Sequence, residues 1–126
     1  MPALTLQLIE DAYAVCRLPA GAEAPAPVRG RFSMSIRAVE ETTIVCPLDL
    51  APHDAEVDPG WRCFRILQVF DFSVPGILAS VLSPLAQAGI GIFASSTFST
   101  DYVLVKASDL RRATDALTAA GHQVTT

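Results

Sequence analysis

The sequence has few charged residues and no excess of basic ones. Charged residues make up 17% of the 126, and 9 lysines and arginines stand against 13 acidic residues, for a net charge of −4. Proteins that bind nucleic acid or anionic membranes through surface charge need a basic patch. The composition therefore argues against both kinds of partner.

The sequence also shows no pattern typical of a membrane-spanning or secretory segment. The first residues, Met-Pro-Ala-Leu-Thr-Leu-Gln, have no basic stretch followed by a long apolar one, and no apolar run approaches the roughly 18 residues of a membrane span. We therefore expect a cytoplasmic protein that makes no contact with a membrane.

Motifs for metal, redox and cofactor chemistry are absent as well. The two histidines, His53 and His122, stand alone, and the acidic cluster around Glu56 lacks the glycine turn and terminal glutamate of a calcium loop. No phosphate-binding glycine loop or nucleophile motif occurs. We expect no metal, no cofactor and no catalysis. The three cysteines, which have no CxxC spacing, are expected to act as small buried apolar side chains: Cys16, Cys46 and Cys63.

Hydrophobic residues are plentiful, at 51% of the chain. This fraction is too high for a disordered chain and high for a small monomer, whose surface is large for its volume. The length suits one domain or two very small ones. We expect a folded protein with some apolar surface covered by a partner.

The first half predicts short strands separated by turns and loops. Glu10-Asp11 divides two apolar runs and suggests a hairpin. Proline and glycine interrupt residues 19–30, which leave room for one helical turn at most, and residues 47–60 resemble a linker. The strand-like runs are Leu4–Ile9, Tyr13–Leu18, Phe32–Ile36 and Thr42–Cys46.

The second half alternates strands and helices. Residues 63–70 are apolar at nearly every position, as in a strand covered on both faces. A helix with Pro84 inside it follows and ends near Gly89, two strands come next, and a second helix ends near Gly121 before a strand through Val124. Residues 61–126 thus predict β-α-β-β-α-β, a ferredoxin-like α+β fold. Residues 1–60 predict a reduced copy of the same unit with a linker, packed beside it.

Two segments carry the chemistry of a small-molecule site. Asp71–Gly76 joins a strand to a helix that opens with Pro-Gly, and unpaired N–H groups at a helix start can bind a carboxylate. Residues 95–101, Ser-Ser-Thr-Phe-Ser-Thr-Asp, supply hydroxyls and one carboxylate. A receptor for a carboxylate beside a group that can hold an ammonium describes a site for a free amino acid.

These segments, together with Trp61–Arg65 and Leu85–Phe93, resemble the ACT domain, and in particular the CASTOR-type tandem ACT proteins and their small bacterial relatives. The resemblance is strong over residues 61–126 and weaker over 1–60. It implies a regulatory protein without catalysis that binds a free amino acid at an interface between ACT units. It also implies a homodimer that controls a further, unidentified protein. The ligand-binding residues that it implies are Val74, Gly76, Ile77, Ile92, Phe93, Thr97, Phe98, Thr100 and Asp101.

Simpler roles remain open for several of these residues. Asp101 suits an ordinary hairpin turn, Gly76 suits close packing of helix on sheet, and Phe93 and Phe98 suit a core. Two other functions also remain open, a dimerisation module without ligand and an enzyme resembling acylphosphatase. The enzyme needs a basic phosphate cradle after the first strand, where this chain has Asp71-Phe72-Ser73-Val74.

Overall fold

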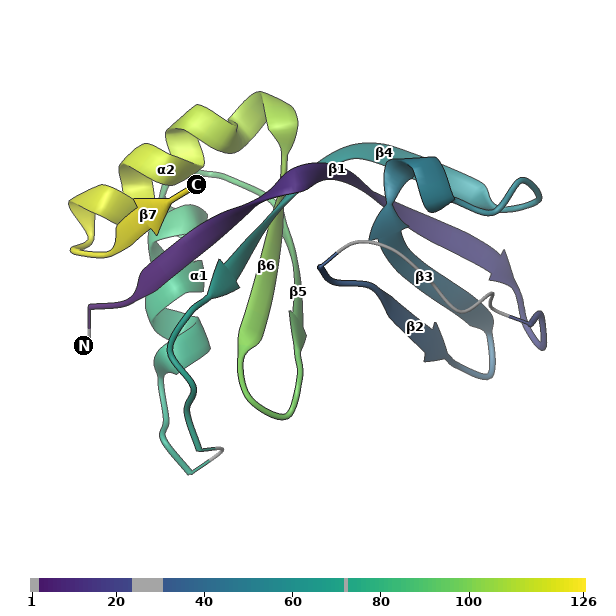
Figure 1. The fold of residues 1–126 in the computed structure, drawn as a ribbon, viewed down its shortest axis with the longest axis horizontal. Helices are drawn as coiled ribbons and strands as arrows, with labels where there is room; N and C mark the ends of the chain where they lie inside the picture. Colours follow the sequence, from purple (N-terminus) through teal and green to yellow (C-terminus); the bar gives the residue numbers. More distant parts are fainter. Residues whose placement is uncertain (1–2, 24–30, 72) are drawn as a thin grey trace. The chain divides into compact units, whose positions relative to one another are not determined.

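The computed structural model describes residues 3–23, 31–71 and 73–126. By its internal contacts the chain forms two compact units, one of residues 1–10 with 62–126 and the other of residues 11–61. Two long strands, β1 (Thr5–Pro19) and β4 (Glu56–Ile66), run from one unit into the other (Figure 1).

The first unit contains the β-α-β-β-α-β order predicted for the second half of the chain. Its sheet has the strand order β7-β1-β4-β6-β5, with β5 and β6 antiparallel and β7 parallel to β1. The ferredoxin-like α+β fold is therefore confirmed, and the start of the chain adds a strand between β4 and β7. After β4 the elements are α1 (Ile77–Gln87), β5 (Ile92–Ser96), β6 (Asp101–Lys106), the short helix η2 (Ala107–Asp109), α2 (Leu110–Ala119) and β7 (Gln123–Thr125).

Both helices of the first unit cover the same face of its sheet. Side chains of Leu6, Phe64 and Val103 on the strands are buried in one cluster with Val81 of α1 and Leu117 of α2. Along a strand every second side chain points to the same face, so Asp101, Val103 and Val105 all face the helices. Each fully buried aliphatic side chain of this cluster stabilises the fold by about 1.5–3 kcal/mol.

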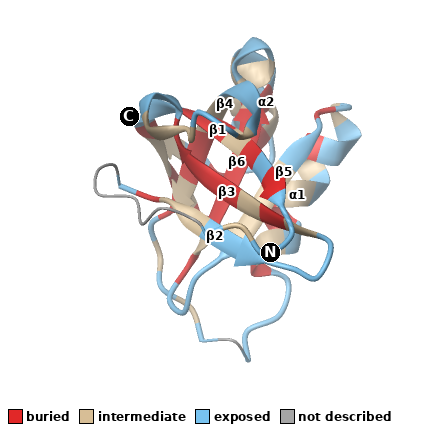
Figure 2. Cartoon of the chain, turned by 90° about the vertical axis from the view of Figure 1, so that its right-hand side faces the viewer, coloured by how far each residue is buried: buried red, intermediate tan, exposed pale blue. Residues whose placement is uncertain are grey.

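The second unit is built on the latter part of β1. There β1 pairs antiparallel with β3 (Glu41–Pro47), which pairs in turn with β2 (Met34–Arg37), and the short helix η1 (Leu48–Leu50) follows. Cys16, Ile44 and Cys46 belong to its small buried cluster. In Figure 2 the buried residues follow β1 and β3, whereas β2 is mostly exposed.

The hairpin predicted at Glu10-Asp11 is wrong, because residues 5–19 form one continuous strand. Both acidic side chains are exposed on that strand, and neither residue is a glycine or an asparagine that would favour a tight turn. Charged residues in the middle of a strand interrupt its apolar pattern without reversing the chain.

The linker predicted for residues 47–60 is wrong in its last part, because β4 already begins at Glu56. Residues 56–60 are all exposed in the structure. Their sequence also lacks the alternation of apolar and polar residues by which a strand is recognised. The predicted loop at 19–30 falls partly on residues 24–30, which lie outside the described residues. The proposed division at residues 60 and 61, with two ACT-like units side by side, stays a prediction.

Helix α1 contains Pro84, and the structure shows how the resulting defect is satisfied. Proline has no N–H, so the Ser80 carbonyl loses its partner four residues on. His122 Nε2 lies 2.8 Å from that carbonyl, and His122 Nδ1 accepts the Leu4 N–H at 3.1 Å. An amide only donates and a carbonyl only accepts, so these partners require the neutral imidazole with its hydrogen on Nε2. His122 thus ties α1 to the start of β1.

No helix in the described part of the chain is both long and apolar enough to cross a membrane.

Candidate functional site

The first unit has a pocket of about 230 Å³ where three segments meet. The loop after β4, the first turn of α1 and the β5–β6 hairpin form its walls. This volume is large enough for a small metabolite. The lining residues are Phe70, Asp71, Val74, Gly76, Ile77, Leu78, Ala79, Thr97, Phe98, Ser99, Thr100 and Asp101.

The start of α1 lies at this pocket and carries backbone donors that have no partner within the helix. Gly76 is the N-cap, with φ 81° and ψ 3°, a left-handed conformation that favours glycine. No side chain caps the helix, and the first intrahelical bond runs from the Ser80 N–H to the Gly76 carbonyl at 3.0 Å. The preceding N–H groups of the first turn therefore have no partner within the helix. Together with the positive end of the helix dipole, they form a receptor for an anion.

The loop before α1 is held in shape by Asp71. Its Oδ1 accepts the Ser73 N–H at 3.0 Å, and its carbonyl accepts the Val74 N–H at 3.0 Å. Asp71 itself is exposed, so its second carboxylate oxygen is open to solvent or to a ligand at the edge of the pocket.

The β5–β6 hairpin is closed by its own threonines. The Thr97 N–H donates to the Thr100 carbonyl at 2.8 Å. The Thr100 hydroxyl is buried and lies 2.7 Å from the Ile66 carbonyl and 3.1 Å from that of Gln68. Its one proton is therefore used to hold the hairpin on the end of β4. Thr100 shapes the pocket, and its hydroxyl has no proton left to donate to a ligand.

Asp101 places a half-buried carboxylate on the helix side of the sheet, opposite the start of α1. Ser96, its cross-strand neighbour, donates a hydrogen bond from its hydroxyl to Asp101 Oδ1. This bond orients the carboxylate and leaves Oδ2 available. Asp71 and Asp101 are the charged residues of the pocket lining, and no basic side chain of the described chain is among them.

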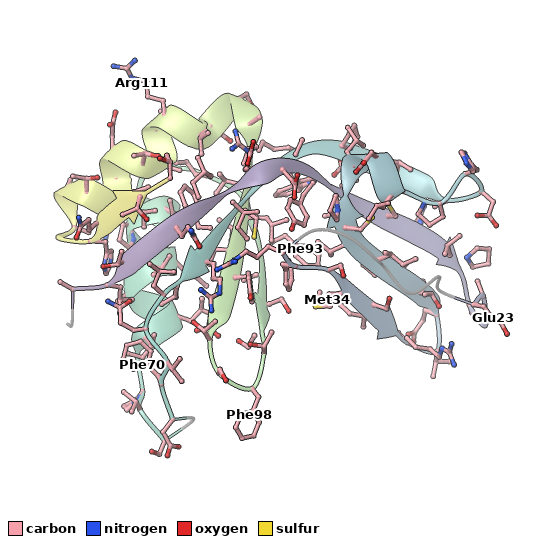
Figure 3. The ribbon with its side chains drawn as sticks, in the orientation of Figure 1. Glu23, Met34, Phe70, Phe93, Phe98 and Arg111 are labelled. Carbon is pink, nitrogen blue, oxygen red and sulfur yellow. The ribbon has the colours of Figure 1, made fainter. Side chains whose placement is uncertain are left out.

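Seven of the nine residues proposed from the sequence line this pocket: Val74, Gly76, Ile77, Thr97, Phe98, Thr100 and Asp101. Ile92 and Phe93 do not. Phe93 pairs across the strands with Leu104, and that register puts it on the face opposite the helices, away from α1 in Figure 3. Ile92 lies at the far end of β5 from the hairpin.

Sequence reasoning missed five lining residues: Phe70, Asp71, Leu78, Ala79 and Ser99. All five lie in the same loop, helix turn or hairpin as residues that it found. The loop motif begins at Asp71, so a carboxylate at the start of the loop is the sequence signal for that residue. The Ser99 backbone carbonyl accepts the Phe70 N–H at 3.3 Å. This contact joins two distant segments, and no local sequence pattern reveals it.

Large apolar side chains surround the pocket and face solvent. Phe98 lies at the tip of the hairpin (Figure 3) and is 85% exposed. Val74 is 44% exposed. Val69, in the loop before the pocket, is 69% exposed. Neighbouring exposed apolar residues at a functional site often mark a protein interface.

The described residues include no group of three or more histidine, cysteine or acidic side chains able to hold a metal ion.

The three cysteines are buried and free. Burial raises the pKa of Cys63 to about 12 and, with a smaller contribution from the nearby Cys16 thiol, that of Cys46 to about 11. Thiols with such high pKa values are protonated and poor nucleophiles.

A model of the ACT domain family matches residues 56–119, just over half of the chain. The chain belongs to the ACT domain family. The match begins with β4 and ends with α2, so it contains every residue that lines the pocket.

The chain is also similar to several solved structures. Protein Atu0741 from Agrobacterium tumefaciens is 42% identical, with 98% of this chain and 93% of that chain covered and a TM-score of 0.91. The ligand-free regulatory subunit of aspartate kinase from Thermus thermophilus is 17% identical, with 91% and 95% covered and a TM-score of 0.68. VC0802 from Vibrio cholerae, described as a possible transport protein, is 17% identical, with 94% and 91% covered and a TM-score of 0.71. At 17% identity the last two show a common fold alone. No curated protein matches the chain.

Proposed function

We propose that this chain is a non-catalytic regulatory protein that binds a free amino acid in the pocket between α1 and the β5–β6 hairpin. The observation that carries the proposal is the pairing, in one pocket, of an uncapped helix start with the Asp101 carboxylate. The helix start would bind the ligand's carboxylate and Asp101 its ammonium. Membership of the ACT family supports a regulatory role, and aspartate kinase regulatory subunits have the same fold.

The exposed apolar residues beside the pocket support a homodimer as part of this proposal. Phe98 and Val74 would be covered by a second copy, and burial of such side chains is favourable. A change at the pocket could then alter the interface and so signal to a further protein. That protein and the cytoplasmic location stay predictions from the sequence.

A thermal-unfolding screen of the twenty amino acids tests the function. A binder present at a hundredfold its dissociation constant stabilises the fold by about 2.7 kcal/mol, which raises the melting temperature by several degrees in a chain of this size. No shift with any amino acid at millimolar concentration would contradict the proposal and favour a dimerisation module without ligand.

Two variants then locate the site by calorimetry. Asp101→Ala should weaken binding because it removes the partner of the ammonium. Gly76→Val should weaken it further, because a side chain in the left-handed conformation strains the helix start and blocks approach to its N–H groups. Gly91→Ala is the matched control: Gly91 has no left-handed backbone and nothing lies within 4 Å of an added Cβ. Unchanged affinity in both test variants would place the site elsewhere.

A further inference from the structure

We propose that His122 is a pH-sensitive clasp: acid protonates its imidazole, which then releases the start of β1 from α1. The inference goes beyond the proposed function, because it concerns the fold and holds whether or not the pocket binds an amino acid. All parts of the clasp belong to the first unit of the chain.

The imidazole of His122 connects three elements through hydrogen bonds. The His122 backbone is fixed at the end of α2, where its N–H donates to the Leu117 carbonyl at 3.0 Å. The ring accepts the Leu4 N–H at Nδ1, at 3.1 Å, and its Nε2 lies 2.8 Å from the Ser80 carbonyl of α1. The residue is only 5% exposed. Both ring nitrogens are therefore used, and only the neutral ring can make both bonds.

A second proton on the ring is incompatible with the bond to Leu4. An imidazolium carries a hydrogen on each nitrogen and accepts no hydrogen bond. A hydrogen on Nδ1 would meet the Leu4 N–H, so two donors would face each other and a positive charge would be buried. The folded chain can take up this proton only if the ring leaves Leu4.

A groove between α1 and α2 gives the ring a way out. Its volume is about 530 Å³. A charged ring that turns into the groove is hydrated there, and it then leaves both the Leu4 N–H and the Ser80 carbonyl. The residues that line the groove are Ser80, Ser83, Pro84, Gln87, Ala88, Ala116, Ala119, Ala120 and His122.

The surroundings supply no negative charge that would hold an imidazolium in place. Helix α1, strand β7 and residues 3–9 contain no ionisable side chain apart from His122's neighbours on α2. Arg112 of α2 bonds to Asp109 and to the Ala88 carbonyl, which brings a positive charge to the groove and disfavours a second one. Three charged side chains of α2 are exposed and none lines the groove: Arg111, Arg112 and Asp115.

The contacts that the clasp supports are few, so its loss has a local effect. Leu4 has two bonds to the end of the chain, one from the Gln123 N–H to its carbonyl at 2.8 Å and one from its N–H to His122. Strand β7 has only three residues. The Ser80 carbonyl has no helical N–H to return to, because residue 84 is proline. Acid should therefore loosen the start of β1, β7 and the turn of α1 around Ser80.

An NMR titration of wild type tests the clasp without any variant. At pH 7.5 two-bond ¹H–¹⁵N spectra should show hydrogen on Nε2 of His122 and none on Nδ1. From pH 7.5 to 5 the Leu4 amide resonance should shift in step with the His122 ring, and it should not follow the exposed His53. Hydrogen on Nδ1 at pH 7.5, a ring that stays neutral down to pH 5, or a Leu4 amide that ignores the protonation of the ring would each overturn the proposal.

Urea unfolding of wild type and His122→Asn over the same pH range measures the effect on stability. Histidine in an unfolded chain takes up a proton near about pH 6.5, whereas the folded chain must give up the Leu4 bond to do so. The unfolded state therefore binds more protons as the pH falls, and stability falls with it. The unfolding constant should rise about threefold or more in wild type relative to the variant, within the limit of about tenfold per pH unit for one proton.

The choice of variants separates titration from packing. The amide oxygen that His122→Asn introduces can accept the Leu4 N–H and does not titrate. His53→Asn is the matched control: His53 is exposed, so this variant should keep the wild-type pH dependence. The carboxylates are common to all three proteins and cancel in the comparison. Parallel curves for wild type and His122→Asn would show that His122 does not sense pH, and the NMR titration decides the matter if that variant does not fold.

Discussion

Single residues in this chain have roles that their chemical type alone does not determine. Thr97 and Thr100 occur in the same hydroxyl-rich turn, yet the Thr100 hydroxyl is used to join the hairpin to β4. Asp71 and Asp101 are both carboxylates at chain turns, but one is exposed and the other half-buried. What each group can bind follows from which of its atoms are already bonded.

The buried thiol of Cys63 should make the free energy of unfolding depend on pH in the alkaline range. Its pKa is about 12 in the folded chain, raised by burial, against 9.0 for an unperturbed thiol. Below pH 9 the thiol is protonated in both states and contributes no pH dependence. Between pH 9 and 12 only the unfolded state ionises, so the free energy of unfolding should fall by about 1.4 kcal/mol per pH unit from this group.

Urea unfolding of wild type and Cys63→Ala from pH 8 to 10.5 measures this contribution. The other titrating groups, Cys46 among them, are common to both proteins and cancel in the difference. The variant should lose less stability than wild type as the pH rises above 9. Parallel curves would show that Cys63 is solvated or ionised in the folded chain.

Among the elements, helix α1 contributes both to the pocket and to the contact with His122. Its first turn forms a wall of the pocket, and its Pro84 leaves a carbonyl that His122 satisfies. The Ser80 carbonyl that binds His122 belongs to the residue directly after the last pocket-lining residue of the helix, Ala79. The hold of His122 on α1 and β1 therefore helps to position the helix start.

A double-mutant cycle tests the link between Pro84 and His122. His122→Ala leaves the Leu4 N–H and the Ser80 carbonyl without their partner, and each buried unsatisfied group costs about 1–3 kcal/mol. In a Pro84→Ala background the helix regains an N–H for the Ser80 carbonyl. There His122→Ala should cost about 1 kcal/mol less, measured by urea unfolding. Additive losses would mean that the two residues act independently.

At the level of the whole molecule, the proposed homodimer rests on both the composition and the structure. Hydrophobic residues form half of a short chain, and Phe98 remains 85% exposed beside the pocket. An interface centred on a large aromatic side chain loses much of its binding energy when that side chain is removed.

Light scattering at micromolar concentration tests the dimer. Wild type should show twice the mass of one chain, and Phe98→Ser should raise the dimer dissociation constant by at least tenfold, a loss of about 1.4 kcal/mol or more. Val39→Ser is the matched control: Val39 is also highly exposed, and it belongs to the other unit of the chain. A monomer at all concentrations, with and without amino acids, would remove the dimer from the proposal.

Local patterns in the sequence were enough to predict the element order of the second half, the helix ends near Gly89 and Gly121, the ACT resemblance and most of the pocket. These features depend on residues close together in the chain: apolar periodicity, a left-handed glycine, a Pro-Gly helix start. Only the tertiary structure decided that β1 is one strand of fifteen residues, that it separates β7 from β4, and that His122 satisfies the carbonyl left by Pro84. Hydrogen bonds of the backbone and of side chains join residues as far apart as Leu4 and Gln123, and neighbouring residues carry no trace of such a partner.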